Sequence, residues 1–150
     1  MKYEEKVQEL GYVIEPVKLE FGKFVQGARS GNLIFTSGQV PIWNGKEIKG
    51  KVGKDLTVEE AYEAAKYCTL NNLKVIKTLA GSLDNVVRIV KVFGMVNAAP
   101  GFDNTPAVIN GCSDLLRELF GDAGKHARSA VGMVIPLNFA VEIEMIVEVE

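Results

Sequence analysis

The sequence predicts a single α+β domain with one mixed six-stranded β-sheet and two helices packed on one face of that sheet. Three observations support this fold class. Short β-rich segments come in pairs at both ends of the chain, two long segments with helical periodicity lie between the pairs, and a continuous apolar run separates the two helices. The 150 residues are the usual length of one domain, and the chain shows no repeat, low-complexity segment or linker.

The first quarter of the chain predicts a short helix followed by two strands. Residues 1–10 favour the helix, which a glycine closes, and residues 13–19 favour an extended segment interrupted by a proline. Residues 24–28 and 33–36 have the composition of strands, and the Ser and Gly at 29–32 between them suit a tight reversal. We therefore expect a β-hairpin at this point.

A glycine-rich region follows the hairpin. Gly38 marks a bulge or a place where the backbone approaches another group closely. Residues 44–56 predict a loop, with a short strand around Ile48. Its lysines are interspersed with glycines, which favours a solvated loop over a nucleic-acid-binding patch. These lysines are Lys46, Lys49, Lys51 and Lys54.

Two helices are predicted in the middle of the chain. Thr57 and Glu60 form a capping box for the first helix, which ends at Gly81. The second begins at Thr105–Pro106, because Pro favours the first helical position, and Gly121 ends it. Their apolar faces consist of Ala61, Ala65, Cys68, Asn72, Val75, Ile76 and Leu79 in the first helix and Val108, Cys112, Leu115, Leu116 and Leu119 in the second.

Three further strands complete the predicted sheet, at residues 86–96, 127–134 and 140–149. The first is apolar on both faces, which is typical of a central strand. In the last, alternate residues from Val141 onward face the helices, and the mostly acidic residues between them face outward. A two-layer fold leaves this outer face bare, and an exposed apolar sheet face marks an interface. We expect a homo-oligomer with sites between subunits; the alternative is a monomer with scattered surface hydrophobic residues.

Arg128 is the main candidate functional residue that the pattern alone identifies. It shares one face of its strand with Ala130 and Gly132, which leave room around the guanidinium group. A guanidinium group can bind a carboxylate through two parallel hydrogen bonds, so this arrangement suits an anion pocket. The alternative is an arginine on an edge strand that points into water.

Composition excludes several classes of protein and site. The net charge of −2 argues against a nucleic-acid-binding protein that depends on bulk positive charge. One histidine and two distant cysteines cannot form a common zinc site, and no phosphate-binding loop or dinucleotide motif is present. We expect Cys68 and Cys112 to be buried, reduced thiols, which suits a cytoplasmic protein, and we expect no membrane span.

Three segments resemble the motif blocks of the reactive intermediate deaminase family (Rid, also called YjgF-like). The order of elements also resembles that family from about residue 24 to residue 149, whereas residues 1–20 lie outside the resemblance. The three segments are Leu33–Pro41 (LIFTSGQVP), His126–Val131 (HARSAV) and Val141–Ile146 (VEIEMI).

The resemblance implies a chorismate-mutase-like fold and a homotrimer whose three sheets enclose a central barrel, with sites between subunits. It implies hydrolysis of 2-imino acids, or of enamines of the 2-aminoacrylate type, to 2-oxo acids and ammonia. No metal or organic cofactor is implied, and the expected ligand is a small carboxylate-bearing imino or oxo acid.

The resemblance also assigns roles to individual residues. Arg128 stands at the carboxylate-binding arginine, and Glu142 stands at the acidic position that holds the attacking water. Gly38 and Ala130 stand where backbone groups meet the ligand, and the Ser37 hydroxyl could orient ligand or water.

Four further residues complete the predicted site or depart from the family pattern. Asn110 matches a pocket-lining asparagine, although its helical register equally allows it to face solvent. Phe24 stands where archetypal deaminases of the family have Tyr, so that hydroxyl is absent, and Trp43 is expected to help shape the pocket. His126 replaces a residue that is often Pro; it could reach the cleft and relay protons, or simply be partly exposed.

Two alternatives to a deaminase remain at this point. The same cleft could hold a 2-oxo acid or amino acid as a regulatory ligand in a protein without catalytic activity, or the trimer could serve as a chaperone surface. A ribonuclease or translation inhibitor is the weaker alternative, because one His and one Arg in an acidic chain make a poor phosphate-binding site.

Overall fold

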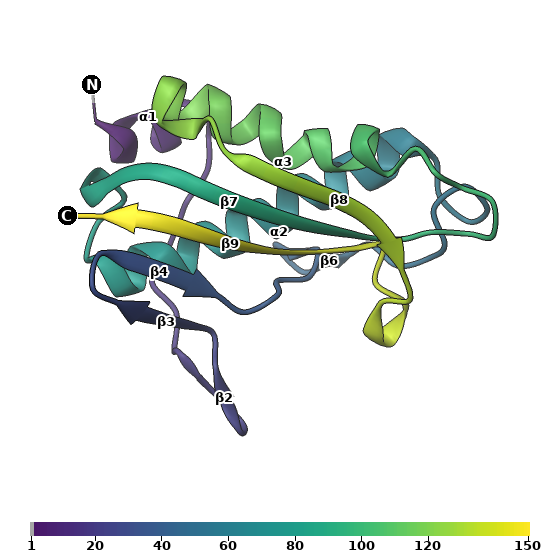
Figure 1. The fold of residues 1–150 in the computed structure, drawn as a ribbon, viewed down its shortest axis with the longest axis horizontal. Helices are drawn as coiled ribbons and strands as arrows, with labels where there is room; N and C mark the ends of the chain where they lie inside the picture. The colour runs from purple at the N-terminus through teal and green to yellow at the C-terminus, as the bar shows by residue number, and fades with distance from the viewer. Residues whose placement is uncertain (1) are drawn as a thin grey trace.

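The computed structural model describes residues 2–150, in which a five-stranded mixed sheet carries helices α2 and α3 on one face (Figure 1). The strand order is β3-β4-β9-β7-β8, with β7 and β8 parallel and the other neighbours antiparallel. The α+β class and the mixed sheet with both helices on one face are confirmed. The strands are β3 (Gly27–Ser30), β4 (Leu33–Thr36), β9 (Val141–Val149), β7 (Val86–Asn97) and β8 (Ala127–Met133).

The prediction of six strands in this sheet is wrong. The expected sixth strand, around Ile48, is replaced by a small separate hairpin in which β5 (Ile42–Trp43) pairs with β6 (Lys46–Glu47). Asn44 and Gly45 both adopt positive φ between these strands, a conformation suited to tight hairpin turns. The turn closes the segment on itself, so it does not extend the main sheet.

The predicted strand at residues 24–28 is divided between two sheets. β2 (Phe24–Val25) pairs with β1 (Glu20–Phe21), and β3 begins after Gln26 and pairs with β4. The backbone N–H of Gln26 donates to Leu19 O at 2.6 Å, and Gln26 O accepts from the N–H of Ser37 at 2.8 Å. Gln26 therefore joins the β1–β2 hairpin to the sheet, and the hairpin projects away from the main sheet (Figure 1).

Both predicted middle helices are present with the expected ends. In α2 (Val58–Ala80) the Thr57 hydroxyl accepts from Glu60 N–H at 3.1 Å and the Glu60 carboxylate accepts from Thr57 N–H at 3.0 Å. α3 (Thr105–Phe120) begins with a proline in its first turn. Within residues 2–150, no helix is both long and apolar enough to cross a membrane.

A glycine in the middle of α3 allows the two helices to pack closely. A Cβ atom at Gly111 would overlap the carbonyl oxygen of Tyr62 on α2. Cys68 and Cys112 lie on the facing sides as free, buried thiols, as predicted. Burial raises the pKa of both thiols, that of Cys112 to about 12.

The two faces of the sheet differ as the alternation in the last strand predicts. The alternate residues of β9 that begin with Val141 are buried beneath the helices. On the other face Met95 packs with Ile135 and Phe139, but Phe35 and Val131 are 42% and 39% exposed. One face of the sheet therefore retains exposed apolar side chains within a single chain.

The loop at residues 44–56 is more ordered than a solvated loop. Ile48 and Val52 are buried in the main core. The Lys51 ammonium donates to Asn97 Oδ1 at 2.7 Å, and the Lys49 ammonium lies 4.8 Å from the centroid of the Phe139 ring. The lysines at 49 and 51 thus attach the loop to the end of the sheet, and the expectation of a merely solvated loop is wrong for this part.

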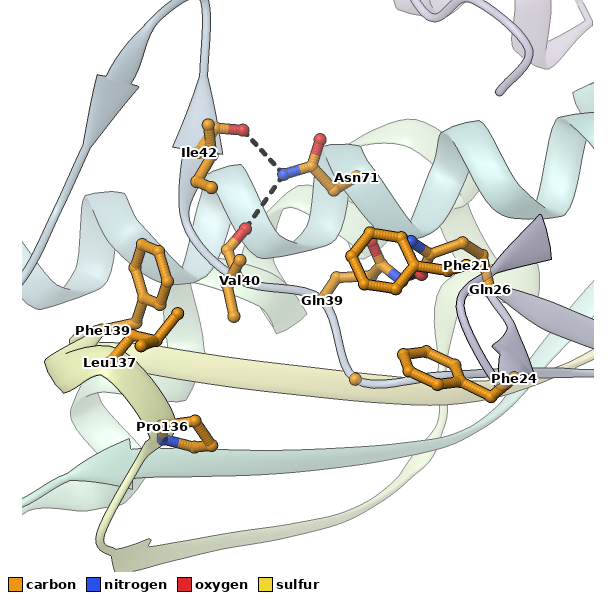
Figure 2. A pocket seen from close by; sticks show the side chains of 11 residues that line it. Phe21, Phe24, Gln26, Gln39, Val40, Ile42, Asn71, Pro136, Leu137 and Phe139 are labelled. Atoms are coloured by element: carbon orange, nitrogen blue, oxygen red, sulfur yellow. Dashed lines mark hydrogen bonds between the residues drawn. The ribbon is translucent and has the colours of Figure 1, made fainter. Parts of the chain in front are cut away.

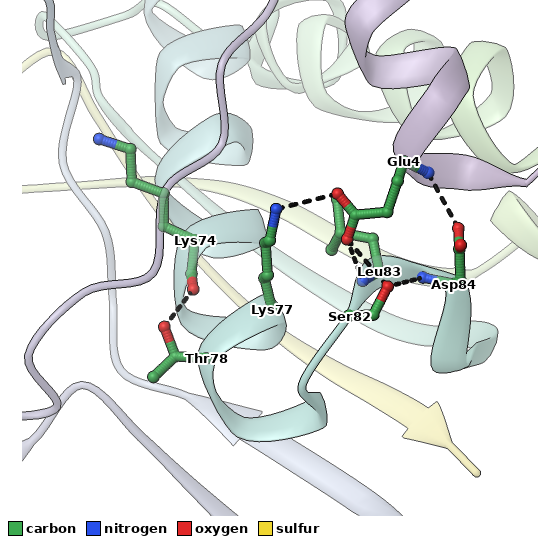
Figure 3. Close-up of polar contacts among 7 residues, drawn as sticks. All are labelled: Glu4, Lys74, Lys77, Thr78, Ser82, Leu83 and Asp84. Atoms are coloured by element: carbon green, nitrogen blue, oxygen red, sulfur yellow. Dashed lines mark hydrogen bonds and ion pairs between the residues drawn. The ribbon is translucent and has the colours of Figure 1, made fainter.

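A carboxylate on the N-terminal helix forms several hydrogen bonds to the end of α2 and the turn that follows it (Figure 3). Glu4, in α1 (Tyr3–Glu9), accepts from Lys77 Nζ at 2.9 Å, Ser82 Oγ at 3.0 Å and Leu83 N–H at 2.7 Å. Its own N–H donates to Asp84 Oδ1 at 3.0 Å. Burial alone would raise the pKa of Glu4, but the hydrogen bonds from Lys77, Leu83 and Ser82 outweigh it and lower the pKa.

Glu4→Ala should lower the free energy of unfolding by about 1–3 kcal/mol, because it leaves several donors without their shared acceptor. The pKa of Glu4 is lower in the folded state, so its stabilisation is present above the unfolded pKa and is lost as pH falls through the folded pKa. Urea denaturation at several pH values measures both effects. Glu5→Ala, an exposed neighbour, is the control, and an equal loss in both variants would contradict the assignment.

Candidate functional site

The predicted site residues form two separate groups, with Arg128 in one and Glu142 beside the other. We call Asn110, Ser113, His126 and Arg128 the arginine cluster. We call the cavity beside Gly38 the glycine pocket. In the strand register Arg128 is level with Val92 and Met145, which are buried under the helices. Glu142 is level with Met95 and Val131 on the other face. One chain therefore does not bring Arg128 and Glu142 together.

Arg128 uses one nitrogen to contact α3. Its Nη1 donates to Asn110 Oδ1 at 2.8 Å and to Ser113 Oγ at 3.1 Å. These two bonds account for both hydrogens of Nη1 and leave the Nε–Nη2 edge for another acceptor. Among residues 2–150 no carboxylate forms an ion pair with Arg128. Asn110, which could equally have faced solvent, is exposed and contacts Arg128.

His126 continues this cluster into the protein. Its Nδ1 lies 2.6 Å from Gly124 O, and its Nε2 lies 2.9 Å from Ser113 Oγ. Burial lowers the pKa of His126; the Gly124 hydrogen bond opposes this shift, and the charges of Arg128 and Arg117 add to it. The ring is therefore part of the arginine cluster and not simply an exposed residue.

Ser113 is the member of the cluster that sequence reasoning missed. It lies three residues after Asn110, so the two share one face of α3. That spacing was the available signal. Ala130 lies on the same face of β8 as Arg128, but its carbonyl oxygen accepts from Thr105 Oγ1 at 2.9 Å.

The glycine pocket is an apolar cavity of about 480 Å³ (Figure 2). Phe21 and Phe24, whose ring centroids are 5.3 Å apart, lie on one side of it. Asn71 fixes another wall, since its Nδ2 donates to Val40 O at 3.0 Å and Ile42 O at 2.8 Å. The cavity is lined by Phe21, Phe24, Gln26, Gly38, Gln39, Val40, Ile42, Asn71, Pro136, Leu137 and Phe139.

Two residues that were expected near the substrate are not among those that line this cavity in the single chain. Ser37 does not line it, because its hydroxyl donates to Val25 O at 2.7 Å and so joins β2 to the end of β4. Trp43 does not line it either; the Lys74 ammonium lies 4.6 Å from its ring centroid. Sequence reasoning also missed Asn71, whose backbone partners are about thirty residues away.

Gly38 and Glu142 are in direct contact. A Cβ atom at Gly38 would collide with Glu142 Oε2, so a larger residue at this position would displace the carboxylate. Glu142 is about half buried, and burial raises its pKa, with a further contribution from the charge of Glu144. The arrangement places an acidic group with a raised pKa next to Gly38, which is one of the residues that line the pocket. Nowhere in residues 2–150 do three His, Cys, Asp or Glu side chains gather to form a metal site.

Comparisons with known proteins agree with the fold and the motif blocks. Residues 4–149 match the family model described as YjgF/chorismate mutase-like, putative endoribonuclease. The match includes most of the first twenty residues, which the motif resemblance had left outside.

Three relatives illustrate the range of similarity. Protein TCP17 of Trypanosoma cruzi is 37% identical over 145 residues, which are 95% of this chain and 91% of that protein. The crystal structure of Atu1372 from Agrobacterium tumefaciens, a protein of unknown function, superposes with a TM-score of 0.89 at 40% identity and covers 99% of this chain and 92% of that one. E. coli TdcF with bound serine gives a TM-score of 0.60 at 26% identity, covering 91% and 94%.

Glu144→Gln should lower the pKa of Glu142 while leaving it above its usual value, because burial is the larger cause of the shift. NMR titration of the Glu142 side-chain carboxyl carbon in both proteins measures the change. Glu148→Gln, on the same face of β9, serves as the control. A Glu142 pKa that does not respond to Glu144→Gln would contradict the assigned contribution.

Proposed function

The chain belongs to the YjgF/chorismate mutase-like family, and from that membership and the two groups of residues we propose that it is a Rid-type deaminase. Its reaction is the hydrolysis of 2-imino acids, or of enamines of the 2-aminoacrylate type, to 2-oxo acids and ammonia. The observation that carries the proposal is Arg128, whose Nη1 is held by Asn110 and Ser113 while its Nε–Nη2 edge is left for a ligand.

A carboxylate is the chemical group that best suits this free edge. Two parallel N–H donors match the two oxygens of a carboxylate, and each bond is strengthened by charge. Serine, which the related TdcF structure holds, also carries a carboxylate. We therefore assign Arg128 to the substrate carboxylate, with Asn110 fixing its orientation.

The complete site requires a second copy of the chain. Arg128 and Glu142 lie on opposite faces of one sheet, so a small substrate cannot reach both within one protomer. A cyclic trimer that buries the exposed apolar face with Phe35 and Val131 would bring β8 of one protomer to the glycine pocket of its neighbour. Arg128 and Ala130 would come from one protomer, and Phe24, Gly38 and Glu142 from the next.

The proposed reaction needs only a bound water and a proton acceptor. The oxygen of the water forms a bond to the carbon of the protonated imine while Glu142 accepts one proton from the water, which gives a carbinolamine. Glu142 returns that proton to the amino nitrogen, the C–N bond breaks, and the hydroxyl proton passes to the departing ammonia to give ammonium and a 2-oxo acid. A raised pKa suits Glu142 to both transfers.

The alternative is a protein that binds a small carboxylate and catalyses no reaction. Measuring both pyruvate binding and ammonia release distinguishes the two. Phe24 contributes an apolar ring and no hydroxyl to the pocket, so it supplies no proton. RNA cleavage is less well supported, because both ring nitrogens of the single histidine have hydrogen-bond partners and the net charge is −2.

Arg128→Ala should lower kcat/KM for 2-iminopropanoate by at least about 100-fold, since it removes two charge-assisted hydrogen bonds to the carboxylate. Ammonia release from an imine generated in situ by an amino-acid oxidase measures turnover. Arg128→Lys keeps the charge but loses the planar fork, so we expect intermediate activity. Circular dichroism and Tm show whether each variant is folded. Normal turnover by folded Arg128→Ala would refute the site, and pyruvate binding by a wild-type protein without turnover would favour the non-enzymatic alternative.

Glu142→Gln should lower kcat by about 100-fold or more with little change in KM, because the amide cannot accept the proton of the water. If sites lie between protomers, mixing Arg128→Ala with Glu142→Gln chains should restore activity. Random reassembly leaves about a quarter of the sites with both intact residues. Mixed oligomers as inactive as either parent would contradict the shared site.

A further inference from the structure

The arginine cluster continues beyond the two side chains that hold Arg128. We infer that Ser113 and His126 are positioning residues, which orient the Arg128 guanidinium for a carboxylate through one directed chain of hydrogen bonds. The inference rests on the proposed carboxylate site at Arg128, but it concerns binding and does not depend on which reaction follows.

The direction of every bond in this chain is determined by its inner end. Gly124 O can only accept, so the proton of a neutral His126 ring lies on Nδ1, 2.6 Å away. Nε2 is then an acceptor, and the Ser113 hydroxyl, at 2.9 Å, donates to it. The lone pairs of Ser113 Oγ are thereby left for Arg128 Nη1, at 3.1 Å.

The direction of these hydrogen bonds determines which edge of the Arg128 guanidinium group is left for a carboxylate. Ser113 and Asn110 each accept one hydrogen of Nη1, so the guanidinium group is held by two hydrogen bonds. An arginine held only by Asn110 could rotate about its long side chain, and ordering it on binding would reduce affinity. Without the His126 acceptor, the Ser113 hydroxyl would be free to turn its hydrogen toward Arg128, and the two donors would oppose each other.

The protonation state of His126 should make carboxylate affinity depend on pH, which a merely structural role would not do. Arg117 on α3 and Arg128 on β8 both disfavour the imidazolium form; Lys125 is ion-paired with Asp122 at 3.5 Å. Protonation of His126 would place a hydrogen on Nε2 and remove the acceptor of the Ser113 hydroxyl. Carboxylate affinity should therefore decrease as pH falls through the pKa of His126.

The test measures pyruvate affinity by NMR titration of the full-length protein. Ser113→Ala should bind pyruvate about five- to tenfold more weakly than the wild type, the effect of one hydrogen bond. Ser113→Thr retains the hydroxyl and should restore affinity to within about twofold of the wild type. Ser129→Ala, one residue from Arg128 on β8 with its side chain on the opposite face of the sheet, is the matched control and should bind normally.

The pH dependence is the second readout. Wild-type pyruvate affinity should fall as pH is lowered through the pKa of His126, which lies below its ordinary value, whereas His126→Gln should show a flattened profile. Equal affinity of Ser113→Ala and wild type, or an unchanged pH profile in His126→Gln, would overturn the inference. No pyruvate binding by wild type would overturn it as well. If pyruvate binding responds as expected but no imine is hydrolysed, the inference stands and the proposed deaminase activity fails.

Discussion

The alternation of side chains along β8 and β9 is the constraint on which the functional geometry depends. Successive residues of a strand point to opposite faces, and pairing across β9, β7 and β8 keeps each face in register. Arg128 is therefore committed to the helix side and Glu142 to the open side. A shift of one residue in either strand would exchange core and solvent residues. The buried side chains of β9 therefore also fix the position of Glu142.

Glycines then adjust this regular framework where groups must approach closely. Gly38 leaves space for the carboxylate of Glu142 at the edge of the pocket, and Gly94 leaves space for Ile109 beneath α3. Gly111 lets α3 pack against the backbone of α2. Because α3 carries Asn110 and Ser113, its close packing also determines where the partners of Arg128 lie. The conformation of the binding groups is thus set by contacts in the core.

The sequence predicted the parts of the fold that local chemistry determines. The capping box at Thr57, the glycine after α2 and the alternation of β9 each act over a few residues, and each prediction is confirmed. The small β1–β2 and β5–β6 hairpins were not predicted as separate units, since two-residue strands have almost no periodicity to detect. The side-chain partners Asn71 and Ser113 were missed because their contacts lie far away in the sequence.

The environment of His126 also explains why Arg128 is the charged group of the arginine cluster in a chain of net negative charge. Burial and the neighbouring arginines favour the neutral ring, so the ring can accept a hydrogen bond from Ser113 without adding charge. Arg128 is then the charged donor of the cluster, and no ion pair within residues 2–150 neutralises it. A small anion that reaches this edge therefore meets a fixed donor pair and no competing carboxylate. The acids of β9 lie on the other face of the sheet, so the carboxylate of Glu142 does not neutralise the arginine of its own chain.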